Sequence, residues 1–257
     1  MILLLTVSLF GCATVRKRPP GPPLSDREAG QILHLMQEQE GRISSFYALG
    51  RVVAGDWYGQ SDADILTVGV RKPYRIKIEI THSWGQPLLH ILIDGKKVEV
   101  LSFRENRLYV GTFTPQALSR FIPAGLDPDL IWGALRGYPN LLPHRDFRSL
   151  GAHQISLFDE KGEEVETIDL YRGQALPKTV TYPERDIQVV YSEFHEQEGV
   201  SYAGSVKLGH LVGGKTLALR YEKMVFHPAI PEDIFVIKKP PSAEIVDINR
   251  AGWENTP

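Results

Sequence analysis

A strictly alternating segment, Tyr74–Ile80, is the feature that most constrains the fold. In the order Tyr-Arg-Ile-Lys-Ile-Glu-Ile, apolar side chains take every second position and charged side chains lie between them. A period of two is typical of a β-strand, because successive side chains point to opposite faces of a sheet. The segment therefore predicts a sheet with one apolar face and one face exposed to water.

Similar β-rich segments recur along most of the chain. Asp94-Gly95 and Lys161-Gly162 each lie between two of them and predict tight hairpins. Because short connections favour antiparallel neighbours, we expect one curved sheet of about eleven strands wrapped around short helices, a mainly β fold with a helical lid (α+β). The tail from Lys239 onward is expected to be extended and loosely held. The expected strands are residues 46–54, 62–70, 74–80, 88–93, 97–103, 108–111, 154–158, 164–171, 177–182, 187–194, 202–208 and 216–226.

A helix is expected before the first strand. Ser25-Asp26-Arg27-Glu28 matches a capping box, in which the Ser and Glu side chains satisfy free backbone donors at a helix N-terminus. The helix is expected to end at about Glu40, since Gly41 fits a C-terminal stop. Its apolar stripe is Ile32, Leu33 and Met36.

A helical insert interrupts the strands. Thr114-Pro115 and Asp127-Pro128 each combine an N-cap residue with proline at the first helical position. They predict short helices over residues 116–121 and 129–135, the second ending at Gly137. Helices this short are unstable alone, so they must lie on an apolar surface. The apolar residues of the insert are Leu118, Phe121, Ile122, Leu126, Leu130, Ile131, Trp132 and Leu135.

The N-terminus has features of a bacterial lipoprotein signal. Residues 2–10 form an apolar run, and Gly11 precedes Cys12, the only cysteine in 257 residues. The pattern predicts a signal peptide over residues 1–11 and lipid attachment at Cys12, although no positively charged segment precedes the run. A buried N-terminal strand with a core thiol is the alternative. A transmembrane helix is excluded, since it needs about 20 apolar residues and charges begin at Arg16.

The residues after Cys12 are expected to form a lipid-anchored linker. Four prolines within Pro19–Pro23 predict a semi-rigid spacer. The basic run Arg16–Arg18 either contacts anionic headgroups or is merely solvated. Ala13 stands where the best-known bacteria use Asp for inner-membrane retention, so we expect the outer membrane, facing the periplasm. The expected organisation is a signal peptide at 1–11, the linker at 12–24, one domain at 25–247 and a loose tail at 248–257.

Composition and motifs give no positive case for an enzyme. Hydrophobic residues make up 42%, charged residues 23%, and the net charge is −2, which fits a globular domain and argues against a nucleic-acid partner. The histidines form no metal-binding pattern, and no G-x-S-x-G motif is present. Gly209–Thr216 matches the P-loop expression, but a β-rich segment follows where a P-loop needs a helix. We therefore expect no catalytic residue, nucleotide, metal or cofactor.

Trp84 is the most unusual single residue. The segment Thr81–Pro87 joins two expected strands and places this large aromatic side chain beside Gly85 at a loop tip. One interpretation is that the ring folds back onto the rim of the sheet. The other is that it contacts a membrane or a ligand, since tryptophan suits the interface between headgroups and hydrocarbon.

The order of these segments resembles the LolA/LolB group, the periplasmic carrier and outer-membrane receptor of lipoproteins, and is most similar to the LolB-like lipoproteins. The resemblance runs from about Ser25 to Asp247. The segments that carry it are residues 46–53, 72–79, the Trp84-Gly85 loop, the Gly95 hairpin, the insert 114–137, and residues 176–180, 187–194 and 230–235.

The resemblance implies a half-open antiparallel β-barrel with helices as a lid over a hydrophobic cavity. The family's receptor has a protruding leucine followed by glycine after its third strand, and Trp84-Gly85 occupies that place, which implies a membrane-insertion loop. The implied partners are lipoprotein acyl chains, a LolA-type carrier and membrane lipid through acylated Cys12, in a monomer. The residues expected to line the cavity or its lid are Ile76, Ile78, Ile80, Leu118, Phe121, Ile122, Leu126, Leu130, Ile131 and Leu135.

Two functions remain open on the sequence. The first is a lipoprotein that receives acyl chains and passes them to the outer membrane, which needs a cavity and no cofactor. The second is a structural or envelope-sensing lipoprotein whose half-barrel binds a protein partner and no lipid.

Overall fold

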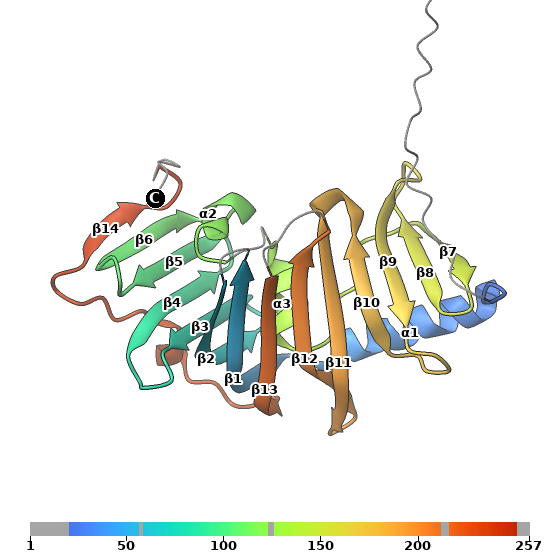
Figure 1. Cartoon of the computed structure of the whole chain (residues 1–257), viewed down its shortest axis with the longest axis horizontal. Coiled ribbons are helices and arrows are strands. Elements are labelled where there is room, and N and C mark those ends of the chain that lie inside the picture. The colour runs from blue at the N-terminus through green and yellow to red at the C-terminus, as the bar shows by residue number, and fades with distance from the viewer. Residues whose placement is uncertain (1–20, 57–58, 123–125, 212–215, 251–257) are drawn as a thin grey trace, which may run out of the picture.

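The computed structural model describes residues 21–56, 59–122, 126–211 and 216–250. Within them one curved sheet of fourteen strands carries three α-helices (Figure 1). The strands are β1 (Ser45–Asp56), β2 (Gly59–Val70), β3 (Arg75–Thr81), β4 (Pro87–Asp94), β5 (Lys97–Ser102), β6 (Arg107–Thr112), β7 (Asp146–Gly151), β8 (Gln154–Phe158), β9 (Glu164–Leu170), β10 (Pro177–Tyr182), β11 (Ile187–Gln197), β12 (Val200–His210), β13 (Thr216–Phe226) and β14 (Glu244–Asp247).

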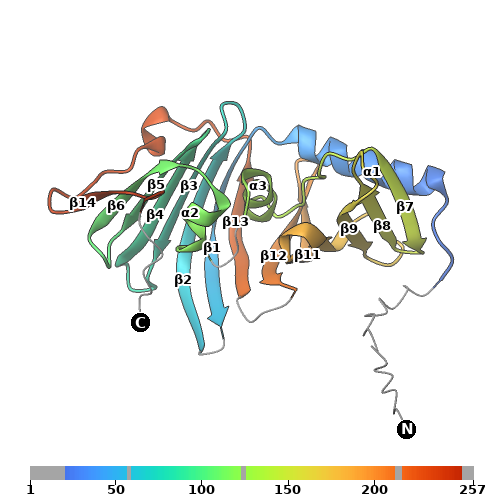
Figure 2. The ribbon, with the colours of Figure 1, turned by 90° about the horizontal axis from the view of Figure 1, so that it is seen from above.

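The sheet is open. Its strand order is β14-β6-β5-β4-β3-β2-β1-β13-β12-β11-β10-β9-β8-β7, so within the described residues β14 and β7 are its two edges. The pairs are antiparallel except for β14 and β6, which are parallel. Figure 2 shows the sheet curving around the helices. The expected mainly β fold with helices on a curved sheet is confirmed, whereas the expected number of strands is wrong.

Two strands were not predicted. β7 has no apolar alternation, and β14 has only four residues; each exists because a neighbouring strand supplies its backbone partners. The C-terminal segment is also held further than expected. The Ile248 N–H donates to the Val110 carbonyl at 2.9 Å, and the Asn249 side chain bonds to both backbone groups of Thr112 at 2.8 and 3.0 Å.

Helix α1 (Asp26–Arg42) begins as predicted. The Ser25 hydroxyl accepts from the Glu28 N–H at 3.3 Å, and the Glu28 carboxylate accepts from the Ser25 N–H at 2.9 Å. Its end differs from the prediction, because Gly41 lies inside the last turn and the extended residue Ile43 is the C-cap. The residues that α1 buries against the sheet are Ala29, Leu33 and Met36.

Helices α2 (Pro115–Ser119) and α3 (Pro128–Leu135) begin at the expected caps. The Thr114 hydroxyl accepts from the Ala117 N–H at 3.0 Å, and the Asp127 carboxylate accepts from the Leu130 N–H at 2.8 Å. Helix α2 is shorter than predicted, so Phe121 lies in the connection after it. The buried residues of α1, α2 and α3 belong to one core cluster with the inner face of the sheet.

The opposite face of β3 is not exposed to water as the alternation predicted. The chain after β13 passes across β2–β6 on its way to β14 (red in Figure 1) and forms the 3-10 helix η2 (Glu232–Phe235) there. The Arg75 guanidinium lies 4.4 Å from the Phe235 ring, and the Lys77 ammonium donates to the Val236 carbonyl at 3.3 Å. The second apolar cluster comprises Val68, Leu92, Leu101, Leu108, Phe235, Ile237 and Ala243.

Candidate functional site

An apolar pocket lies between the sheet and the two short helices. Its volume is about 50 Å³, and each of its fourteen lining residues is apolar. An entirely apolar lining offers no directional group to a polar ligand and favours hydrocarbon. The lining residues are Val52, Ile65, Ile78, Ile80, Ile91, Phe121, Ile122, Leu126, Ile131, Ala134, Leu135, Leu208, Leu217 and Leu219.

Strand register builds the sheet wall of the pocket. Ile78 of β3 pairs with Ile91 of β4, and Ile80 pairs with Ile65 of β2. Since side chains alternate along each strand, residues two apart and their cross-strand partners share the inner face. The wall therefore joins strands that are far apart in sequence, from β4 across β1 to β12.

The helical insert builds the other wall. Phe121, Ile122 and Leu126 come from the connection between α2 and α3, and Ile131, Ala134 and Leu135 come from α3. We call residues 114–122 and 126–135 the lid.

Helix α3 of the lid is fixed by its other face. The buried Trp132 ring packs edge-on against Phe46, with ring centroids 5.0 Å apart. The Tyr74 hydroxyl donates to the Pro128 carbonyl at 2.6 Å. These contacts hold α3 in place beside the pocket.

The structure brings together seven of the ten residues expected to line a cavity. Ile76, Leu118 and Leu130 are buried in the core but do not line the pocket. Seven lining residues were not predicted. Six of them lie on other strands, and only the pairing of those strands with β3 shows that their side chains point to the inner face of the sheet. The residues missed were Val52, Ile65, Ile91, Ala134, Leu208, Leu217 and Leu219.

The pocket opens toward one end of these strands. Ile80 and Leu217 are half-buried, whereas the deeper lining residues Ile78 and Leu219 are buried. Ile80 comes just before the turn between β3 and β4, and Leu217 is the second residue of β13. The register runs from Ile80 through Ile65 and Gly50 to Tyr221, so Leu217 lies beyond this line, toward the same edge of the sheet. The opening therefore lies on the edge of the sheet that carries the Trp84 turn.

Trp84 projects from this turn. Its side chain is 71% exposed, the most exposed large hydrophobic residue among those described. Its ring stacks on the His82 imidazole with centroids 4.0 Å apart, and the turn is closed by the Gly85 N–H donating to the His82 carbonyl at 2.7 Å. Gly85 has φ +89°, which favours glycine. The ring therefore stands in water instead of packing on the sheet.

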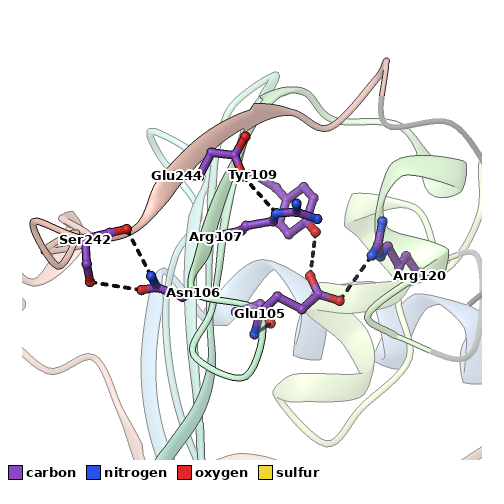
Figure 3. Close-up of polar contacts among 8 residues, drawn as sticks. Glu105, Asn106, Arg107, Tyr109, Arg120, Ser242 and Glu244 are labelled. Atoms are coloured by element: carbon purple, nitrogen blue, oxygen red, sulfur yellow. Dashed lines mark hydrogen bonds and ion pairs between the residues drawn. The ribbon is translucent and has the colours of Figure 1, made fainter.

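Two polar contacts hold the ends of the lid. Beyond α2, Arg120 pairs with Glu105 at 3.1 Å, and the same carboxylate accepts from the Tyr109 hydroxyl at 2.5 Å (Figure 3). Before α3, the N-cap Asp127 pairs with Arg185 at 2.5 Å. Both pairs are partly exposed to water, and ion pairs at the surface contribute roughly 0.2–1 kcal/mol each, so the lid is held mainly by its apolar contacts.

Figure 3 also shows how β14 joins this edge of the sheet. Arg107 pairs with Glu244 at 3.1 Å, and the Asn106 amide donates to the Ser242 carbonyl at 2.9 Å. The C-terminal segment thus anchors the β5–β6 turn, which carries Glu105, the partner of Arg120.

Large polar side chains fill the adjoining part of the inner face. The fully buried Arg136 guanidinium lies 5.1 Å from the Tyr138 ring, and burial lowers the pKa of Arg136 to about 10. The buried Glu166 carboxyl accepts from the Leu142 N–H at 2.8 Å, and burial raises the pKa of Glu166 to about 8. The other large side chains here are the buried Tyr182 and Tyr191.

The structure also bears on the P-loop match, on metal binding and on membrane-spanning helices. Within the P-loop match, Gly209 of β12 pairs with Thr216 of β13, so a strand follows as expected. In the described part of the chain, no group of three His, Cys, Asp or Glu side chains could hold a metal ion, and no helix is long and apolar enough to span a bilayer. Cys12 and the basic run Arg16–Arg18 lie outside the described residues.

Two solved structures share the fold at low sequence identity. A DUF1329 family protein from Desulfovibrio piger has a TM-score of 0.56 at 11% identity, over 84% of this chain and 98% of that chain. A LolA superfamily protein from Nitrosomonas europaea has a TM-score of 0.52 at 13% identity, over 81% of this chain and 97% of that chain. No protein-family model and no curated protein matches the sequence. The similarity establishes that this chain has the same fold as these two proteins.

Proposed function

We propose that the protein is a non-enzymatic, outer-membrane lipoprotein that binds acyl chains of lipoproteins or other lipids and helps insert them into the bilayer. The observation that carries the proposal is the wholly apolar pocket under the lid, which opens toward the exposed Trp84. The LolA-superfamily fold supports the same class of function. A LolA-type periplasmic carrier is the proposed donor of the cargo.

The pocket must widen to hold a chain. An engineered apolar cavity of about 150 Å³ admits benzene, whereas this pocket measures about 50 Å³. Burying hydrocarbon gains about 0.8 kcal/mol per methylene. A long chain therefore offsets the apolar packing that is broken when the α2 end of the lid moves away from the sheet. Helix α2, with five residues, suits such a movement, whereas α3 stays held by Trp132 and Tyr74.

Membrane contact is assigned to two parts of the chain. Cys12, once acylated, anchors the protein through the linker over residues 12–24. Trp84 and Gly85 form the loop that touches the membrane, and the ring suits the headgroup boundary. Because the pocket opens toward this loop, a chain leaving the pocket meets the bilayer directly.

The small volume of the pocket also favours a second candidate. A filled interior is what a structural or envelope-sensing lipoprotein needs, with a protein partner bound on the outside. Native mass spectrometry of the protein beginning at Ala13 separates the two. Co-purifying acyl species support the carrier, and a lipid-free protein that gains no mass with added acyl lipid supports the scaffold.

The Trp84 loop can be tested separately. Trp84→Glu is expected to slow transfer of a fluorescent acyl lipid from the protein to phospholipid vesicles at least tenfold, because a carboxylate is excluded from the headgroup boundary. Leu35→Glu, another exposed hydrophobic position at 48% exposure, is the matched control and is expected to leave transfer unchanged. Equal transfer by the two variants would remove the membrane role of Trp84.

A further inference from the structure

A second cavity lies at the other end of β3, away from the apolar pocket. It measures about 530 Å³, within the range of ligand sites. Seven residues of β3 at about 3.3 Å each place it roughly 20 Å from the Trp84 turn. Its lining residues are Gly41, Ile43, Ser44, Ser45, Val70, Arg71, Lys72, Pro73, Arg75, Pro228, Ile230 and Glu232.

Arg71 is held rigidly in the wall of this cavity. Its Nη2 donates to the Glu40 carboxylate at 2.5 Å, and its guanidinium lies 5.7 Å from the Trp132 ring. Its Nη1 is buried and has no hydrogen-bond partner in the described residues. The Arg71 side chain is 30% exposed, and a guanidinium held in fixed geometry is pre-organised for a phosphate or carboxylate oxygen.

Two further cations lie beside it. Arg75 pairs with both oxygens of Glu232, packs on the Phe235 ring, and keeps a buried Nε without a partner among the described residues. Lys72 is exposed and forms no ion pair with any residue that the structure describes. The cavity thus combines two fixed guanidinium groups with one free ammonium.

The charges of the lining define the charge of the ligand. Arg71, Lys72 and Arg75 against Glu232 leave a charge of +2, which becomes +1 when Glu40, the partner of Arg71, is included. A singly charged anion neutralises this net charge of +1, whereas a multiply charged phosphate adds more negative charge than the cavity can neutralise.

The remaining lining is mixed. Ile43, Val70, Pro73, Pro228 and Ile230 are apolar, whereas Ser44 and Ser45 contribute hydroxyl groups. A ligand with an anionic head and a hydrocarbon or glycerol portion would contact the charged and the apolar residues, whereas a bare anion would leave the apolar residues without a contact.

We propose that this cavity binds the phosphodiester headgroup region of a glycerophospholipid, with the phosphate on Arg71 and Lys72 and the glycerol portion against the apolar lining residues. A soluble glycerophosphodiester presents the same chemistry. This site is separate from the acyl-chain pocket, so the proposal stands or fails independently of the proposed function.

Titration calorimetry of the protein beginning at Ala13 tests the site with two probes. Dihexanoylphosphatidylglycerol below its micelle concentration represents the lipid, and glycerophosphoglycerol represents the free diester and cannot occupy an acyl pocket. Saturable binding of both assigns recognition to the diester, and binding of the lipid alone assigns it to headgroup plus glycerol ester. Absence of saturable binding by both probes overturns the proposal.

Lys72→Glu decides whether this cavity is the site. Reversing the exposed charge is expected to weaken binding at least tenfold without unfolding the protein. Lys161→Glu, an exposed turn lysine between β8 and β9, is the matched control and is expected to bind as the unaltered protein does. Equal weakening by both variants, or by neither, contradicts the proposal, because binding would then be general surface attraction or located elsewhere.

Discussion

The two halves of the inner face are filled in different ways. In the pocket half, formed by β12, β13 and β1–β4, aliphatic side chains meet a lid of two short helices and leave a cavity. In the filled half, against β9–β11, large side chains occupy the space under α3 and the segment after it. The side chains of the filled half are Arg136, Tyr138, Glu166, Tyr182 and Tyr191.

The difference shows how one continuous sheet can combine rigidity with an adaptable site. Rings and a guanidinium packed at core density tolerate little movement. Branched aliphatic side chains under the α2 end of the lid can separate, because their packing is non-directional. The filled half is therefore the support, and the pocket half is the part that can open.

The largest effect expected in this comparison concerns Glu166 and pH. Its pKa is about 8 in the folded protein against an ordinary 4.5, so between these pH values the unfolded chain is ionised while the folded protein keeps its proton. The free energy of unfolding therefore falls as the pH rises from 4.5 to 8, by up to about 5 kcal/mol in total. Above pH 8 it no longer changes through this group.

Glu166→Gln tests this effect, since the amide oxygen can still accept from Leu142. Urea unfolding from pH 4.5 to 8.5 is expected to show a flatter pH dependence for the variant and a higher stability than the unaltered protein at pH 8. Identical slopes for the two proteins would show that Glu166 is ionised in the folded state.

Next in size is the loss of a buried ring. Tyr182→Ala in the filled half is expected to cost about 3–4 kcal/mol in unfolding free energy, because the surrounding side chains cannot close the space. Ile80→Ala, at the half-buried opening of the pocket, is expected to cost less than about 2 kcal/mol. Chemical denaturation measures both, and equal losses would contradict the division into a rigid half and an adaptable half.

A smaller effect of opposite sign is expected at Arg136. This buried cation donates to the Pro139 carbonyl at 3.0 Å, forms no ion pair with a described residue, and has two nitrogens without a partner there. Arg136→Met fills similar space without burying a charge, so unfolding free energy is expected to be unchanged or higher by about 1–2 kcal/mol. Thermal and urea unfolding measure this change. A decrease in unfolding free energy of more than about 2 kcal/mol would show that the guanidinium has a stabilising partner.

The smallest effect concerns the contact that holds α2. Glu105→Gln removes the ion pair with Arg120 and is expected to cost less than about 1 kcal/mol. Amide hydrogen exchange is expected to become faster in residues 115–122 and to stay constant in residues 128–135. Faster exchange throughout both helices would mean that the lid opens as one unit.

Local signals predicted several parts of this architecture. Ser25, Thr114 and Asp127 are caps whose side chains bond to backbone within three residues, so the sequence alone identifies them. The alternation in Tyr74–Ile80 identified β3 and its inward isoleucines for the same reason.

Features that depend on distant partners were not predictable. β7 and β14 lack a pattern of their own and exist through their neighbours. The cover over the charged face of β3 comes from residues more than 150 positions away, as the contact between Lys77 and Val236 shows. Most of the sheet wall of the pocket was missed because Val52, Ile91 and Leu219 share a face only once the strand order is known.

Binding of a fluorescent long-chain acid, 11-(dansylamino)undecanoic acid, tests the central claim most directly. We predict saturable fluorescence enhancement with the protein beginning at Ala13, reversed by palmitate, and weakened at least tenfold by Leu217→Glu at the pocket opening. Ile245→Glu, at an exposed position of β14, is predicted to bind normally. Absence of saturable binding, or binding that Leu217→Glu leaves unchanged, would contradict an acyl-chain site in this pocket.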